Sequence, residues 1–213
     1  MAFLFLYDMG KITAVTRQKR NPNRLNIYVD GEFAFGLADM VGATLRIGQE
    51  LAQSEIDQLQ DQDLLEKARQ SALNFLSYRP RSIAEVRRNL IKKEFAELVV
   101  EQVIGRLQEL ELLNDKTFAQ YWVEQREAFK PRSAIALRSE LYQKGVANDI
   151  IEEVLLDLDE TAAARKAAET KAPRWQHLDR EQFQKKLGGF LQRRGFHYGI
   201  VRQIIDEMWE ENV

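Results

Sequence analysis

Three similar stretches, VRRNLIKKEF at 86–95, LRSELYQKGV at 137–146 and LGGFLQRRGF at 187–196, decide the fold of this chain. Each predicts a helix with one apolar face. Gly145 and Gly195 fall where a helix commonly ends in a left-handed residue, a conformation that costs glycine nothing. Glu94 stands at this position in the first stretch, so that helix ends differently or tolerates about 1 kcal/mol of strain.

An apolar pattern of four residues follows each stretch at the same distance. It consists of Val99-Val100 with Val103-Ile104, Ile150-Ile151 with Val154-Leu155, and Ile200-Val201 with Ile204-Ile205. The spacing i, i+1, i+4, i+5 places the four side chains on one face of a helix. Each unit therefore contains a second amphipathic helix after a short connection.

Proline turns precede the first two stretches. Arg79-Pro80-Arg81-Ser82 follows a helix expected over 68–78, and Lys130-Pro131-Arg132-Ser133 follows one expected over 118–129. Proline stops the preceding helix, and Ser82 with Glu85 forms the capping-box pattern that begins the next one. The third unit lacks this turn and has Ala172-Pro173-Arg174-Trp175 nearby. Three units of three helices predict an elongated tandem array, and stacked repeats typically form a binding surface.

The first fifty residues differ in character, because residues 11–37 predict a β meander. Lys11–Gln18 is rich in β-branched residues, with Ile12 and either Ala14 or Val15 facing inward, and Leu25–Val29 alternates apolar with polar residues. Asp30-Gly31 is a strong signal for a two-residue hairpin turn. We therefore expect three antiparallel strands, and no strand from about Leu59 to Val213. Ser54 with Asp57 resembles a weak capping box that opens a helix through Leu59 or slightly beyond.

The predicted fold is mainly α: an elongated tandem array of three three-helix repeats with a small N-terminal antiparallel β meander. The expected parts are an N-terminal extension over 1–50, a linker helix with the first repeat over 51–110, the second repeat over 111–160 and the third over 161–213.

Composition narrows the possible chemistry. The 213 residues are 45% hydrophobic and 30% charged, which is typical of a folded chain. The absence of cysteine excludes disulfides and thiolate catalysis. His177 and His197 have no histidine or cysteine nearby in the sequence, so no metal or other cofactor is expected. The apolar run Ala2–Tyr7 is too short to span a bilayer, and we expect a cytoplasmic protein without membrane contact.

Charge is segregated along the chain. The formal net charge is −2, but residues 1–60, 61–110, 111–160 and 161–213 carry −1, +1, −5 and +3. Near-neutrality is thus a cancellation, which suits a binding surface divided by sign.

Basic residues recur at equivalent places in the three units and are the candidate binding site. For a single arginine, a solvated face with glutamate partners such as Glu85, Glu94 and Glu140 is the better explanation. For the repeated turn we favour anion recognition, because a helix begins there between cationic side chains. The candidates for partner or DNA binding are Arg79, Arg81, Arg87, Arg88, Lys92, Lys93, Arg126, Lys130, Arg132, Arg138, Lys144, Lys185, Lys186, Arg193, Arg194 and Arg202.

Other residues predict no catalysis. Phe118, Tyr121, Trp122 and Phe129 have helical spacing and are predicted to be core rather than base-stacking residues. The chain has no GxxxxGK[ST], GxGxxG, GxSxG or HExxH motif, and its acidic pairs lie on predicted helical surface. We therefore expect a binding protein and not an enzyme.

Taken together, these motifs resemble the RecX family of bacterial regulators of the RecA recombinase. The resemblance rests on ALNFLSYRPRS at 72–82, LELLNDKTFA at 110–119 with Trp122-Val123 and Arg126, KPRS at 130–133 and ELYQKG at 140–145. IYVDGE at 27–32 is similar to an N-terminal extension found in many members.

The resemblance implies a modulator, mainly an inhibitor, that lies in the groove of the RecA–DNA filament. It implies restraint of ATPase, strand-exchange and co-protease activity in recombinational repair and the SOS response. The implied partners are the RecA filament and, through weak, salt-sensitive contacts, single- and double-stranded DNA, with the chain acting as a monomer. The third unit departs from the family pattern at its missing basic turn and at Gly188-Gly189.

Two alternatives remain at this point. The chain could be a stand-alone DNA-binding regulator whose units act like helix-turn-helix readers, although the acidic middle weighs against three units following one duplex. It could also be a helical scaffold for another partner.

Overall fold

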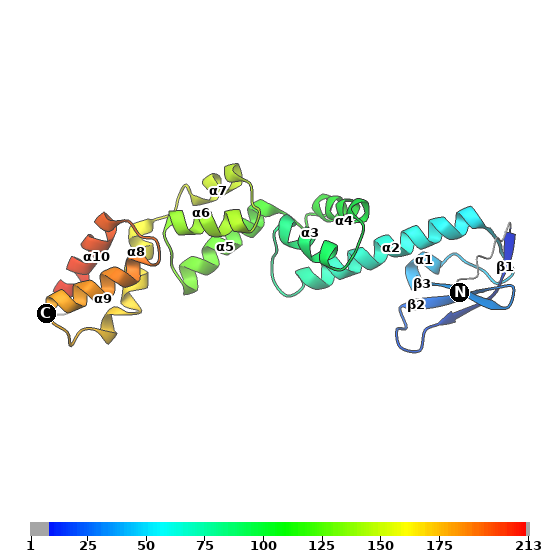
Figure 1. The fold of residues 1–213 in the computed structure, drawn as a ribbon, viewed down its shortest axis with the longest axis horizontal. Helices are drawn as coiled ribbons and strands as arrows, with labels where there is room; N and C mark the ends of the chain where they lie inside the picture. The colour runs from blue at the N-terminus through cyan, green and yellow to red at the C-terminus, as the bar shows by residue number, and fades with distance from the viewer. Residues whose placement is uncertain (1–8, 212–213) are drawn as a thin grey trace. The chain divides into compact units, whose positions relative to one another are not determined.

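The computed structural model describes residues 9–211, which form two compact units. The first unit extends to Tyr78 and includes Asn89–Arg106, whereas the second comprises Arg79–Arg88 and the chain from Leu107 onward. Figure 1 shows the elements of each unit in chain order. The run Ala2–Tyr7 lies outside the described residues.

A four-stranded antiparallel sheet begins the first unit. Its strands β1 (Met9–Arg17), β2 (Arg24–Val29), β3 (Glu32–Ala38) and β4 (Glu50–Ala52) lie in the order β3-β2-β1-β4. Asp30 and Gly31 both have positive φ, at 50° and 90°, as the predicted hairpin turn requires. The three predicted strands are confirmed. The fourth strand, β4, is not predicted by the sequence, because its three residues are too few to show alternation and are recognisable only by their pairing with β1.

A register shift in β1 explains which residues of this strand face the core. Ile12 pairs with Val29 and Ala14 with Tyr28, so one extra residue is accommodated between Ile12 and Ala14. The inward face consequently changes parity, and both Ile12 and Val15 pack in the core of the sheet.

Helix α2 (Gln53–Leu76) covers this core with α1 (Asp39–Gly42). The predicted start at Ser54 is wrong by two residues, because Ala52 is the N-cap and its N–H donates to Glu55 Oε2 at 2.8 Å. The predicted end near Leu59 is also wrong, since α2 is 24 residues long and ends at Leu76. Its C-terminal part is the helix expected over 68–78. The buried core residues are Ile12, Leu25, Ile27, Val29, Phe35, Leu37, Leu45, Leu51 and Ile56.

Asp63 of α2 ties the helix to the sheet. Its buried carboxylate accepts two hydrogen bonds from Arg24, at 3.1 and 3.0 Å, and one from the Ala38 N–H at 2.7 Å. Lys67 Nζ lies 2.8 Å from Asp63 Oδ2. Burial acts to raise the pKa of Asp63, but the hydrogen bonds and positive charges outweigh it, and the pKa lies below its usual value.

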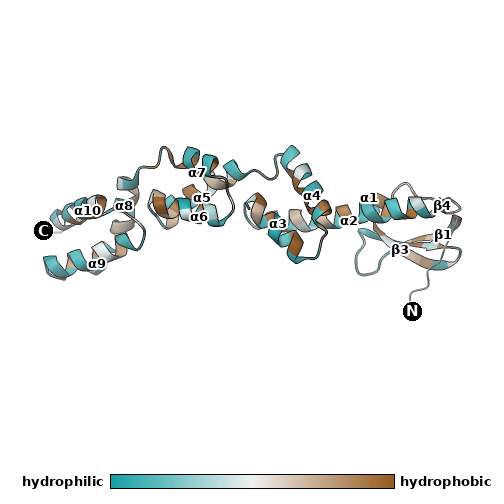
Figure 2. Cartoon of the chain, turned by 45° about the horizontal axis from the view of Figure 1, so that its top comes forward, coloured by the Kyte–Doolittle hydropathy of each residue, from teal (hydrophilic) through white to brown (hydrophobic). Residues whose placement is uncertain are grey.

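The remaining helices form the repeats. After α2 come α3 (Ile83–Lys92), α4 (Glu97–Glu109), α5 (Asp115–Phe129), α6 (Ala134–Gln143), α7 (Asn148–Leu155), α8 (Glu160–Glu169), the short 3₁₀ helix η1 (Ala172–Arg174), α9 (Arg180–Gln192) and α10 (Tyr198–Glu210). Figure 2 shows that these helices carry both apolar and polar residues. Separate cores form among α5, α6 and α7 and among α8, α9 and α10.

Several local predictions can be checked against these helices. Gly145 and Gly195 have φ of 82° and 90°, and Glu94 tolerates the same region with φ of 65°. Phe118 is buried and Trp122 packs at the edge of the same core. The prediction that Phe129 is a core residue is wrong. Phe129 is the last residue of α5 and is 82% exposed, because its position on the helix lies beyond the core.

The Asp63 contact predicts a large effect for Asp63→Asn. The neutral amide leaves the partly buried Arg24 guanidinium without its charge partner, and we expect the first unit to lose about 2 to 4 kcal/mol of stability. Amide hydrogen exchange of β2 and β3 measures this loss. Asp61→Asn, an exposed change on the same helix, is the control. Equal exchange rates in the two variants would contradict the assigned role.

Candidate interaction site

The first proline turn connects the start of α3 to the end of α6. The residues that make this connection all belong to the second unit. Ser82 Oγ donates to the Lys144 carbonyl oxygen at 2.6 Å, so the start of α3 rests against the end of α6. Ser82 Oγ also accepts from the Glu85 N–H at 3.1 Å, and Glu85 Oε2 accepts from the Ser82 N–H at 3.3 Å, which completes the predicted capping box. A Cβ on Gly145 would overlap the Cβ of Ala84, so only glycine fits at this approach. We call these contacts the α3–α6 joint.

Glu85 is the charged centre of the α3–α6 joint. Its side chain is 11% exposed and accepts from Arg79 Nη2 at 2.9 Å and from Lys144 Nζ at 2.8 Å. Burial alone would raise the pKa of Glu85, but the two cations outweigh it and lower the pKa to about 2. A second carboxylate, Asp115, accepts the Ile83 N–H at 2.8 Å, and burial raises its pKa.

An equivalent joint connects α6 to α9. Ser133 Oγ caps α6 by accepting the Ala136 N–H at 3.2 Å, and the Ser133 N–H donates to the Arg194 carbonyl oxygen at 3.2 Å. Arg194 Nη1 donates to the Pro131 carbonyl oxygen at 2.8 Å. A Cβ on Gly195 would overlap Ser133 Oγ. The α6–α9 joint thus repeats the geometry of the α3–α6 joint about fifty residues further along the chain.

Trp122 gathers several cations of the second unit around its indole ring. Its Nε1–H and Arg126 Nε–H both donate to Glu140 Oε2 at 2.8 Å, while Arg132 Nε lies 2.9 Å from Glu140 Oε1. Arg126 and Lys144 each lie 4.7 Å from the ring centroid, and Arg79 lies 6.0 Å from it. These distances are those of cation–π contacts. The sequence predicts Trp122 only as a core residue, because Glu140, Lys144 and Arg79 are distant from it in the chain.

The sixteen candidate residues therefore fall into two groups: those that are engaged in internal contacts or partly buried, and those that are exposed. Five side chains are engaged in the joints or around Trp122, namely those of Arg79, Arg126, Arg132, Lys144 and Arg194. Arg138 pairs with Glu152 across α6 and α7. Arg81 and Arg87 are partly buried, and burial together with the neighbouring charge of Arg79 lowers the pKa of Arg81.

The other eight candidates are exposed. We call them the exposed cations: Arg88, Lys92, Lys93, Lys130, Lys185, Lys186, Arg193 and Arg202. Lys185, Lys186 and Arg193 lie on α9, and Arg202 lies on α10, which packs against it. Across residues 9–211, none of these eight side chains pairs with a carboxylate.

Residues 9–211 contain neither a metal-binding cluster nor a helix that could cross a membrane. No cluster of three His, Asp or Glu side chains in this range is placed to hold a metal ion. No helix in this range is both long enough and apolar enough to cross a membrane.

The fold and the two joints define a helical tandem-repeat protein with an N-terminal sheet. Four family models match it: the regulatory protein RecX N-terminal domain over residues 10–52, and the first, second and third three-helix domains of RecX over 68–107, 114–155 and 158–205. The chain belongs to the RecX family of regulatory proteins, which confirms the resemblance seen in its sequence.

Relatives and solved structures agree with this assignment. Regulatory protein RecX of Bacillus subtilis strain 168 is 34% identical over 96% of this chain and 79% of its own length. RecX of Prosthecochloris aestuarii is 39% identical over 67% of this chain and 93% of its own length. A crystal structure of regulatory protein RecX superposes with a TM-score of 0.70 and 26% identity, covering 92% of this chain and 99% of that one. The RecX structure from Lactobacillus salivarius gives a TM-score of 0.60 and 29% identity, covering 68% of this chain and 97% of that one.

The α3–α6 joint predicts that Gly145→Ala destabilises the second unit. Overlap with Ala84 adds to the cost of a left-handed alanine, and we expect a loss of about 2 to 4 kcal/mol. Urea unfolding followed by tryptophan fluorescence measures it, since all three tryptophans lie in this unit. Gly199→Ala is the control, because this position lies on α10 of the same unit and a Cβ there makes only an ordinary contact, at 3.7 Å from His197 Nδ1. If both variants unfold alike, the joint is not as close as described.

Glu85 gives the second unit a specific pH dependence. Its folded pKa of about 2 lies below the ordinary value of 4.5, so its pairing stabilises the fold fully above pH 4.5 and is lost as pH falls towards 2. We expect Glu85→Gln to be less stable than the parent at neutral pH, and the difference to shrink below pH 4.5.

Unfolding midpoints in urea between pH 2.5 and 7 measure this difference. Glu169→Gln, an exposed change at the end of α8, should follow the parent throughout. A constant difference between Glu85→Gln and the parent at every pH would contradict the assigned pairing.

Proposed function

We propose that this chain regulates the RecA recombinase by binding in the groove of the RecA–DNA filament, mainly as an inhibitor. It restrains ATPase, strand-exchange and co-protease activity in recombinational repair and the SOS response. It does so by binding rather than by catalysis, as a cytoplasmic monomer with weak contacts to DNA. Membership of the RecX family supports the partner, and the exposed cations support the mode of binding.

The division of the cations is the observation that carries the mode of binding. Arg79, Lys144 and Arg194 donate hydrogen bonds to groups inside the chain. They therefore support partner binding indirectly, by holding the repeats in position. Within residues 9–211 the exposed cations make no ion pair with a carboxylate, so they can meet acidic protein surface or phosphate at small cost. Contacts of this exposed kind are screened by salt, so the interaction is expected to be salt-sensitive.

The second repeat disfavours the alternative of a stand-alone DNA-binding regulator. Residues 111–160 carry a net charge of −5. Asp149 of α7 and Asp157 just after it are exposed and pair with no cation within residues 9–211, so a duplex lying along this helix would meet negative charge. Acidic side chains facing phosphates repel them, so three equivalent duplex-reading units are not supported.

Removal of two cations from α9 tests the proposal. We expect Lys185→Gln with Lys186→Gln to raise the concentration needed for half-inhibition of RecA ATPase on single-stranded DNA about tenfold, because two phosphate or carboxylate contacts are lost. The control, Lys166→Gln with Arg174→Gln, removes two exposed cations of the same repeat outside α9 and α10. This control should inhibit like the parent.

The parent protein decides the broader claim in the same assay. Inhibition at well below one copy per RecA protomer would indicate action at filament ends. No effect of the parent on RecA ATPase, strand exchange or co-protease activity would refute the proposed function, and equal inhibition by all three proteins would refute the role of α9.

A further inference from the structure

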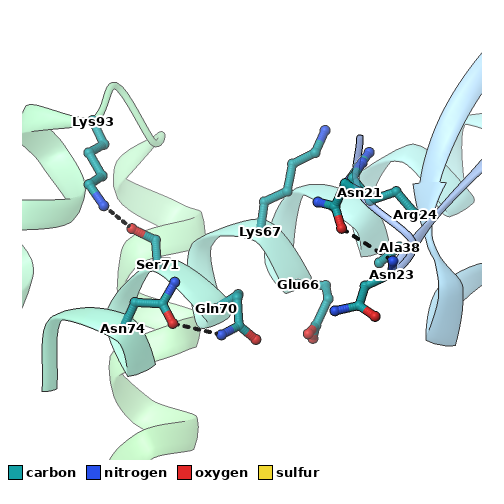
Figure 3. A pocket seen from close by; sticks show the side chains of 10 residues that line it. All are labelled: Asn21, Asn23, Arg24, Ala38, Glu66, Lys67, Gln70, Ser71, Asn74 and Lys93. Atoms are coloured by element: carbon teal, nitrogen blue, oxygen red, sulfur yellow. Dashed lines mark hydrogen bonds between the residues drawn. The ribbon is translucent and has the colours of Figure 1, made fainter. Parts of the chain in front are cut away.

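A polar cleft of about 470 Å³ lies in the first unit, beside the exposed face of α2 (Figure 3). We call it the Asn74 cleft. The turn between β1 and β2 borders one end, and Lys93, directly after α3, borders the other. Its lining residues are Asn21, Asn23, Arg24, Ala38, Glu66, Lys67, Gln70, Ser71, Asn74 and Lys93. Its volume is in the range of small-molecule sites and large enough for one nucleotide.

Three hydrogen-bond donors converge at the Lys93 end of the cleft. Lys93 Nζ donates to Ser71 Oγ at 2.6 Å, which leaves the Ser71 hydroxyl proton and two ammonium protons for another acceptor. Gln70 Nε2 donates to Asn74 Oδ1 at 2.9 Å, and this bond orients the Asn74 amide so that its NH₂ group remains a donor. Figure 3 shows Lys93, Ser71 and Asn74 gathered at this end.

The acidic groups near the cleft are already neutralised. Glu66 accepts two hydrogen bonds from Arg69, both at 2.7 Å. The buried Asp63 is paired with two lining residues of the cleft, Arg24 and Lys67. Within residues 9–211, no carboxylate pairs with Lys93, so the donor-rich end carries uncompensated positive charge.

We propose that the Asn74 cleft binds a phosphate group through Lys93, Ser71 and Asn74. Ammonium, hydroxyl and amide donors around one point match the several acceptor oxygens of a phosphate, and hydrogen bonds to an ionised acceptor are the strong ones. Two sources share this chemistry, a nucleic-acid strand and a free nucleotide. For the strand, the inference rests on the proposed function, because the RecA filament contains DNA.

Asn74→Asp is the sharpest variant for this cleft. It keeps an oxygen for Gln70 to donate to, removes the NH₂ donor and opposes the phosphate charge, and its exposed position favours normal folding. We expect binding to weaken at least about tenfold. Lys93→Gln is the second variant, and for an oligonucleotide it should also reduce the slope of log K against log salt by about one. Gln60→Glu adds the same negative charge to the exposed surface of α2 outside the cleft and is the control.

The experiment uses the full chain without RecA. Fluorescence anisotropy measures the binding of a labelled oligothymidylate of twenty nucleotides. Calorimetry measures the binding of ATP and of inorganic triphosphate. Weakening by Asn74→Asp for the oligonucleotide alone identifies a strand, whereas weakening for ATP and triphosphate alone identifies a free nucleotide.

Two results would overturn the inference: equal affinities of the parent, Asn74→Asp and Lys93→Gln for every probe, or no binding of any probe by the parent. RecA ATPase inhibition is measured separately for the same proteins. Failure of the parent to inhibit RecA would therefore refute the proposed function without affecting the result for the cleft.

Discussion

The second unit depends on one recurring contact, in which a serine-capped helix start lies against the glycine end of the next repeat's middle helix. The backbones approach so closely at Gly145 and Gly195 that a single methyl group would overlap Ala84 or Ser133. Glycine also satisfies the positive φ that ends each helix. Glycine thus meets two requirements, the positive φ at the end of the helix and the close approach of the neighbouring helix. The position of each helix end and the packing of the neighbouring helix therefore depend on the same residue.

This contact determines which cations remain accessible. A helix start packed against a helix end brings Lys144 to Glu85 and Arg194 to the Pro131 carbonyl oxygen. Because these groups are partly buried, leaving one unpaired would cost more than a surface ion pair contributes. Arg79 and Arg132 of the basic turns therefore make contacts inside the chain, whereas Lys130 and the exposed cations of α9 and α10 are the residues that we propose for partner contact.

The sequence predicted what depends on local periodicity and failed where distant partners decide. The alternation of Leu25, Ile27 and Val29 and the four-residue apolar patterns were sufficient for the sheet and the repeats, because each is set by neighbours in the chain. Asp63 gave no local sign of its role, since Arg24 lies 39 residues away. The candidate cations were identified by type, but Lys144 and Glu85 are 59 residues apart, so their pairing required the fold.

Ionic strength should affect the two classes of cation differently. At 0.15 M salt the Debye length is about 8 Å, so exposed charges are strongly screened while pairs removed from water are screened much less. The Glu85 side chain is 11% exposed and Lys144 is 24% exposed, whereas Lys185 and Lys186 lie in solvent. Salt should therefore weaken the contacts proposed for α9 well before it loosens the α3–α6 joint. Under the proposed function, the protein would release a charged partner while its repeats keep their packing, as expected of a reversible regulator.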